Sequence, residues 1–202
     1  MGAMYVKQPN GTLLPIVGDA KGGGGGGEVL IYDDMVASGE SGWFSIYLYD
    51  CAPPPEGYVY EKYVFEITQH GTNSSFSQPL YLRMNEDENY SYFWAWSLGD
   101  RFPGTNWIEL CYPESVSHSF GVVTRGEFGL LGSVNSHMAF CNHVSTYVSE
   151  DSPRSDTYWG SYCNLQQVIS GIETIQIIPD YGSFMTETYI KIWGILATAE
   201  VQ

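Results

Sequence analysis

The segment NEDEN, which begins at Asn85, is the densest acidic cluster in the chain. Its oxygen-bearing residues Asn85, Asp87 and Asn89 alternate as the first ligands of a calcium loop do. The rest of that pattern fails, because Tyr90 stands where a glycine is required and Trp96 where the bidentate glutamate belongs. We therefore expect a solvated hairpin turn at this position and no metal site.

The segment HMAFCNH is the second place where chemistry is conceivable. It groups His137, Cys141 and His143, and Cys163 follows further along, so the residue types suit zinc. In a β-strand, however, His137, Cys141 and His143 would share a face with Ala139 and pack together. We expect packing, and we assign no metal.

Two groups of carboxylates lie in segments that have the composition of loops. Asp50 and Glu56 form one group, and Glu86, Asp87 and Glu88 form the other. A pair of carboxylates is what glycoside hydrolysis requires, so a glycan-cleaving enzyme stays open as an alternative. The chain has 23 acidic residues and no Gly-x-Ser-x-Gly nucleophile motif. The sequence therefore predicts a non-enzymatic protein with no catalytic residues and no cofactor.

Aromatic residues are abundant, at 15% of the chain. Rings occur at both alternating positions of several expected strands, which is more than one core face requires. Exposed tyrosine and tryptophan can stack on sugars or fill a subunit interface, and the competing interpretation is that all of them belong to the core. The candidate ligand-binding residues are Trp94, Trp96, Trp107, Trp159 and Tyr162.

The charge of the chain limits its partners. The formal net charge is −15, with only eight lysine and arginine residues. Binding of nucleic acid depends on clustered cations, and an anionic membrane surface would repel this chain. No apolar run approaches the roughly 20 residues of a membrane span. The first twenty residues also lack the basic and apolar regions of a secretory signal. We expect no nucleic acid as partner and no membrane insertion.

Short segments of alternating apolar and polar residues, separated by Gly, Pro, Asn or Asp, predict the elements that would position these side chains. Many short strands with turn signals between them indicate an all-β sandwich. Sustained helical periodicity is absent. The clearest strands are expected at residues 43–49, 60–68, 78–84, 90–96, 172–178 and 188–196.

The stretch KGGGGGGE, residues 21–28, divides the chain. Six consecutive glycines resist both helix and strand, and the motif of a phosphate-binding loop is absent. We interpret the stretch as a flexible linker between an N-terminal anchoring arm, residues 1–20, and a β-sandwich domain, residues 29–202. The arm contains the turn signal Pro-Asn-Gly between two pieces that could be short strands.

The chain has four cysteines, which are widely and irregularly spaced: Cys51, Cys111, Cys141 and Cys163. No Cys-x-x-Cys pair occurs. Free buried thiols are the expected state, with disulfides as the alternative.

Two stretches of the sandwich carry a resemblance to a known family. The segment LRMNED, from Leu82 to Asp87, is followed by Tyr90, and the chain closes on IKIWGI, from Ile190 to Ile195. Together with the tyrosine-bearing strand YEKYVFEIT, these segments resemble a module of virion proteins in tailed bacteriophages. The likeness covers residues 43–196, with Trp193 where that module usually has tyrosine. The start MYVKQPNG is similar to the short starts of phage fibre and head-fibre proteins.

The resemblance implies a jelly-roll β-sandwich, often trimeric, displayed on a tail fibre, tail tip or head fibre. It implies a structural or attachment role at the virion surface, a homotrimer, and contact with other virion proteins through the arm. The anchoring residues of the arm would then be Tyr5, Val6, Leu13, Leu14 and Ile16. The alternative is a carbohydrate-binding module that recognises host-surface or mucus glycans, which requires exposed aromatic residues beside Asp or Asn.

Overall fold

The computed structural model describes residues 5–7, 13–17, 27–71, 77–88, 92–96, 101–111, 119–130, 138–149, 152–163 and 171–199. These residues form β-strands, with one short 3-10 turn, η1, at Leu48–Asp50 and no α-helix in the described ranges. In this part of the chain no helix has the length and apolar character needed to cross a membrane.

Strands were expected at six places in the sandwich and on both sides of the Pro-Asn-Gly turn of the arm, and all of them are present. The strands are β1 Tyr5–Lys7, β2 Leu13–Val17, β3 Glu28–Val36, β4 Phe44–Tyr47, β5 Tyr58–His70, β6 Leu80–Met84, β7 Tyr92–Trp96, β8 Arg101–Thr105, β9 Ile108–Cys111, β10 Ser119–Leu130, β11 Met138–Ser149, β12 Ser152–Cys163, β13 Thr174–Pro179 and β14 Thr188–Thr198.

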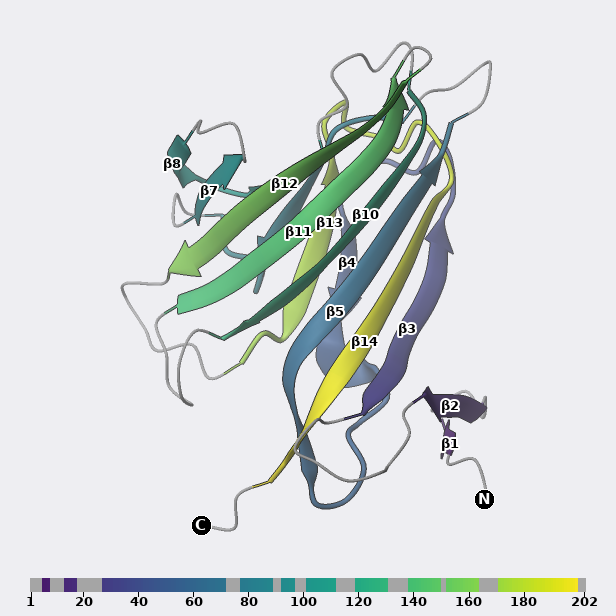
Figure 1. Ribbon diagram of the computed structural model, residues 1–202, viewed down its shortest axis with the longest axis vertical. Coiled ribbons are helices and arrows are strands. Elements are labelled where there is room, and N and C mark those ends of the chain that lie inside the picture. The colour runs from purple at the N-terminus through teal and green to yellow at the C-terminus, as the bar shows by residue number, and fades with distance from the viewer. Residues whose placement is uncertain are drawn as a thin grey trace.

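Two antiparallel sheets pack face to face (Figure 1). The smaller sheet has the order β4-β13-β6-β9, and the larger sheet contains the run β3-β14-β5-β10. The chain passes β3, β4, β5, β6, β9, β10, β13 and β14 in turn and crosses between the two sets of four strands at every step except β6 to β9, which pair within the smaller sheet. Eight strands connected in this way form a jelly roll. The predicted all-β jelly-roll sandwich is therefore confirmed.

Two hairpins extend the larger sheet beyond β10, in the order β10-β11-β12-β7-β8. The first residue of the hairpin β11–β12, Met138, lies opposite its last residue, Cys163. The hairpin β7–β8 likewise has Tyr92 opposite Thr105, and β7 pairs with β12. The two insertions thus join each other at one end of the larger sheet, far from β3 (Figure 1).

Alternation of side chains builds the core between the sheets. Phe65 and Ile67 of β5 are buried, and Tyr63 packs partly buried beside them, as the sequence pattern predicts. The smaller sheet contributes Leu80 and Leu82, each 0% exposed. Burying a side chain of this size stabilises the fold by roughly 2 kcal/mol.

The core also holds polar side chains where β10 and β11 meet. The Thr124 and Ser145 hydroxyl oxygens lie 2.8 Å apart, and Ser145 Oγ donates to the Leu110 carbonyl oxygen at 2.6 Å. His143 is 3% exposed on the same face. The hydroxyl groups of Thr124 and Ser145 therefore have partners, which removes most of the cost of their desolvation.

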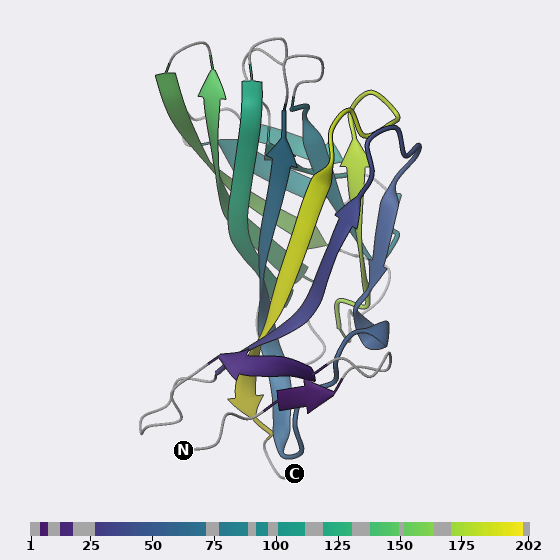
Figure 2. The ribbon, with the colours of Figure 1, turned by 90° about the vertical axis from the view of Figure 1, so that its right-hand side faces the viewer.

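The strands of the arm continue the larger sheet at its β3 end. β1 pairs with β2, and β2 pairs with β3 through Ile16 opposite Val29 and Val17 opposite Glu28 (Figure 2). The predicted division into arm, linker and domain stays a prediction, because residues 18–26 lie outside the described ranges.

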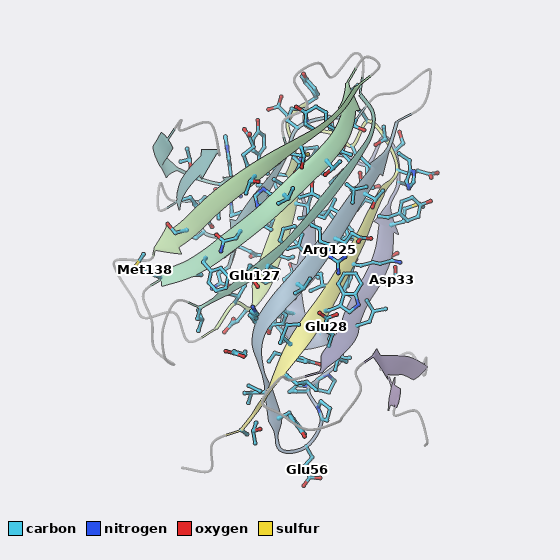
Figure 3. The ribbon with its side chains drawn as sticks, viewed as in Figure 1. Glu28, Asp33, Glu56, Arg125, Glu127 and Met138 are labelled. Carbon is cyan, nitrogen blue, oxygen red and sulfur yellow. The ribbon has the colours of Figure 1, made fainter. Side chains whose placement is uncertain are left out.

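The outer face of the larger sheet carries one row of alternating charge. Asp33, Lys191, Glu66 and Arg125 stand opposite one another across β3, β14, β5 and β10. Near this row, the Lys62 ammonium nitrogen lies 2.6 Å from Glu127 Oε2. Figure 3 shows Arg125 and Glu127 on this face. Positive and negative side chains therefore balance locally, although the whole chain is strongly acidic.

Candidate functional site

A cleft of about 430 Å³ opens on the side of the sandwich where β3 and β4 lie at or near the edges of their sheets. Residues 31–34 of β3 form one wall, and residues 45–47 of β4 with residues 50–52 form the other. Figure 2 looks onto this side of the molecule. The cleft is therefore framed by backbone of the jelly roll itself.

Apolar side chains line the deepest part of the cleft. Ile31, Ile46 and Ala52 are each no more than 2% exposed and belong to the core. They lie here because inward-facing residues of both sheets meet between the two edges. A ligand in the cleft would contact a surface that the fold already holds rigid.

Two tyrosines at the end of β4 present their rings to solvent. Tyr47 is 40% exposed and lines the cleft, and Tyr49 is 67% exposed with its ring centroid 5.5 Å from that of Tyr47. Between them Leu48 is buried, and its backbone N–H donates to the Glu173 carbonyl oxygen at 2.8 Å. Burial of Leu48 thus turns both neighbouring rings outward.

Carboxylates dominate the charge of the cleft. Asp33, Asp34 and Asp50 line it, and no lysine or arginine is among its lining residues. The Lys191 ammonium reaches Asp33 only at 4.0 Å, from the outer face of the sheet. The described residues hold no group of three or more His, Cys, Asp or Glu side chains that could bind a metal. The three aspartates therefore do not converge on one point.

Hydrogen-bond donors in the cleft are neutral groups. Burial, and then the charge of Asp34, raises the pKa of Tyr32, so its hydroxyl keeps its proton. Burial, and then the charge of Asp50, raises the pKa of the Cys51 thiol to about 11. Cys51 is therefore a thiol at neutral pH and a poor nucleophile. The cleft has the chemistry of a binding site, with carboxylate acceptors and hydroxyl donors.

The predicted ligand-binding residues lie elsewhere. Trp107 is half-buried, and its ring lies 5.1 Å from that of Tyr81 at an interplanar angle of 35°. The other four are brought together on neighbouring strands, with Trp94 opposite Gly160 and Tyr162 opposite Tyr92. The side chains of Trp94, Trp96, Trp159 and Tyr162 lie outside the described part of the structure, so their role stays a prediction.

The predicted anchoring residues all lie on the arm strands. Tyr5 and Val6 belong to β1, and Leu13, Leu14 and Ile16 belong to β2. Their backbones pair within the arm hairpin, and Ile16 also pairs with β3. Their side chains are outside the described part, and anchoring stays a prediction.

Sequence reasoning missed most of the cleft. It considered Asp50 as a loop carboxylate, but it did not join Asp50 to Asp34 or Tyr47. The available signal was the pattern YLYD, residues 47–50, in which two rings flank a leucine and an aspartate follows.

The NEDEN segment is a structural turn at its described positions. Asn85 has φ 53°, and its Nδ2 donates to the Gly171 carbonyl oxygen at 3.0 Å. Its Oδ1 accepts from the backbone N–H groups of Glu173 and Thr174 at 2.8 and 3.3 Å. The side chain therefore joins the end of β6 to the start of β13. The expected hairpin was wrong, because β6 and the following strand β7 belong to different sheets.

Replacing Asn85 by alanine should lower the free energy of unfolding by about 2 kcal/mol, because three hydrogen bonds are lost and alanine is strained at this φ. Asn85→Gly loses the same bonds but tolerates the conformation, so its loss should be smaller. Urea denaturation measures both. Unfolding midpoints equal to wild type for both variants would show that other contacts hold the turn.

The second conceivable metal cluster packs into the core. Ala139, Cys141 and His143 share the buried face of β11, and Cys141 Sγ lies 3.7 Å from His143 Nδ1. The shared face follows the strand alternation predicted from sequence. His137 and the side chain of Cys163 are outside the described part. Cys51, Cys111 and Cys141 are free thiols.

Comparison with known proteins adds little to this description. No protein-family model matches the chain, and no curated protein matches it. One solved structure that aligns is described as the crystal structure of botulinum neurotoxin serotype C1 binding domain. It is 9% identical, the match has a TM-score of 0.24, and it covers 98% of this chain and 48% of that one. The chain thus spans about half the length of that structure, and so low a score carries no argument.

Proposed function

We propose that this protein is a non-catalytic structural protein of a tailed-bacteriophage virion. In this proposal the jelly roll projects from the particle surface as a homotrimer, and the N-terminal arm docks on another virion protein of the capsid or tail. The observation that carries the proposal is the jelly-roll strand order and connectivity, an architecture used in viral capsid and lectin domains. The resemblance of the segments LRMNED and IKIWGI to virion modules supports it.

The charge distribution supports assembly of copies through the larger sheet. A net charge of −15 makes copies repel one another over most of their surface. The alternating row on the outer face offers matched charges instead, and the exposed apolar residues Val123 and Val144 lie beside it. This face is where subunits would meet with the least electrostatic cost.

The mass of the intact chain in solution tests the trimer. We expect about three times the 22.5 kDa of one chain at micromolar concentration. Light tryptic digestion, with cleavage after Lys21, should remove the arm before the sandwich is cut and leave the trimer intact. A trimer that dissociates when the arm is removed would place oligomerisation in the arm instead.

A charge-reversal variant locates the interface. Arg125→Glu places a second negative charge next to Glu66 in the row and should shift the mass toward the monomer. Glu56→Lys, which changes a charge at the far end of the molecule (Figure 3), is the matched control and should stay trimeric. A monomeric wild-type protein would contradict the trimer proposal directly.

A further inference from the structure

We propose that the cleft between β3 and β4 is a binding site for a neutral saccharide. The proposal goes beyond the structural role above and does not depend on which particle carries the protein. It rests on the shape of the cleft, its exposed rings, its polar groups and the sign of its charge.

The shape is that of a ligand site. Its volume of about 430 Å³ falls within the range of small-molecule pockets, roughly 300–1,000 Å³. The buried Ile31 and Ile46 form an apolar base, and the polar groups stand around the rim. A sugar ring has the same two-sided character, with C–H groups on its faces and hydroxyl groups around its edge.

The exposed rings supply a stacking surface. Tyr47 lines the cleft and is 40% exposed, although the flanking Ile46 and Leu48 are buried. Tyr49 extends this aromatic surface at an angle of 46° to Tyr47. A tyrosine has an apolar ring face and a polar hydroxyl end, so its ring can stack on the C–H face of a pyranose.

The polar groups match hydroxyl groups in both directions. Asp34 and Asp50 accept hydrogen bonds, and Tyr32 and Ser45 bear hydroxyl donors. Three of these groups are held by other bonds, and the Tyr32 side chain hydrogen-bonds with that of Asp34. Asp34 Oδ1 accepts from the backbone N–H of Met35 at 2.8 Å, and Ser45 Oγ accepts from Gln176 Nε2 at 3.2 Å. Groups held in place before binding cost less entropy when the ligand arrives.

The charge selects the class of sugar. Asp34 and Asp50 line the cleft and no lysine or arginine does, while Asp33 is balanced by Lys191 on the outer face, so sialylated, sulfated or phosphorylated glycans would be repelled. Because the carboxylates do not converge as metal ligands do, binding should not require calcium. A neutral hexose or short neutral oligosaccharide satisfies both conditions.

The test uses the full-length protein and calorimetric titration with maltotriose, lactose, cellobiose, N,N′-diacetylchitobiose and mannobiose, each with and without EDTA. We expect at least one neutral saccharide to bind, with unchanged affinity in EDTA. Sialyllactose, the anionic probe, should bind at least tenfold more weakly than that saccharide. Glucosamine, the cationic probe, should bind no more tightly than that saccharide.

Variants connect binding to the cleft. Tyr47→Ala and Asp34→Asn should each weaken binding at least tenfold, while Tyr181→Ala, which removes another exposed tyrosine that does not line the cleft, should not change it. Each variant is accepted only if its melting temperature stays close to wild type.

Three results would overturn the proposal. These are no binding of any neutral probe up to about 10 mM, equal losses for Tyr47→Ala and Tyr181→Ala, and tighter binding of glucosamine than of every neutral sugar. None of these results bears on the mass of the assembly, so the saccharide site and the trimer are tested independently.

Discussion

Replacing Gly126 by alanine is expected to lower the free energy of unfolding by about 3 kcal/mol or more, one of the largest effects of any single methyl group in this chain. A Cβ at this position would lie 2.3 Å from His143 Cβ, 2.4 Å from the Asn142 carbonyl oxygen and 2.8 Å from His143 Cα. Two of these three atoms are backbone, so β10 and β11 would have to separate to relieve the clash.

The packing around Gly126 explains why the strands approach so closely. Gly126 stands opposite Phe65 on β5 and opposite His143 on β11. The rings of Phe65 and His143 lie 6.1 Å apart, so they meet over the space that a side chain at position 126 would fill. Glycine within a strand often marks such a close approach.

Thermal unfolding measures the effect, and for a chain of this size 3 kcal/mol corresponds to a fall of about 6–12 °C in Tm. Gly171→Ala is the matched control, because a Cβ there meets nothing within 4 Å. It should change stability by less than about 0.5 kcal/mol. A Gly126→Ala protein as stable as the Gly171→Ala protein would show that β10 and β11 are not paired as described.

The second large expected effect is loss of stability in acid through His143. Complete burial lowers the pKa of His143 from 6.5 to about 3. The folded protein therefore holds the neutral ring, and the unfolded chain takes up the extra proton between these two values. Stabilisation is full above pH 6.5 and is lost as the pH falls toward 3, by about 1.4 kcal/mol per unit. Between pH 7.5 and pH 4.5 the loss should be about 2–3 kcal/mol.

The measurement compares urea unfolding of wild type and His143→Gln at both pH values. The variant cannot take up this proton, so its loss in acid should be smaller than that of wild type by about 2–3 kcal/mol. The many carboxylates are common to both proteins and cancel in the difference. His70→Gln, which changes an exposed histidine, should behave as wild type. Parallel pH profiles for wild type and His143→Gln would mean that the ring is hydrated in the folded state.

The sequence predicted strands well where apolar residues alternate and poorly where they do not. In β5 the inward positions are Tyr63, Phe65 and Ile67, and the period of two is plain. In β10 and β11 the inward positions include Thr124, Gly126, His143 and Ser145. The hydroxyl groups of Thr124 and Ser145 find partners inside the molecule. The alternation of apolar and polar residues in the sequence cannot distinguish buried polar side chains from those on the solvated face of a strand.

The candidate site could not be predicted for a different reason. Asp34 and Tyr47 belong to strands in different sheets, and the cleft exists only because β3 and β4 lie on the same side of the sandwich. Strand order depends on long-range pairing, which local patterns do not encode. The aromatic candidates at positions 94, 96, 159 and 162 were chosen by residue type alone, and they lie at the other end of the larger sheet.

The two inserted hairpins have a consequence for how such a chain can change over evolutionary time. Each hairpin leaves the jelly roll and returns to it at one place, as the pairs Met138–Cys163 and Tyr92–Thr105 record. Lengthening, shortening or replacing a hairpin therefore leaves the path of the eight core strands untouched. Because β7 pairs with β12, however, the hairpin β7–β8 keeps its place in the sheet only where β11–β12 is present. Relatives of this chain should differ in width at that end of the larger sheet, gaining or losing strands two at a time, while the β3–β4 side keeps its geometry.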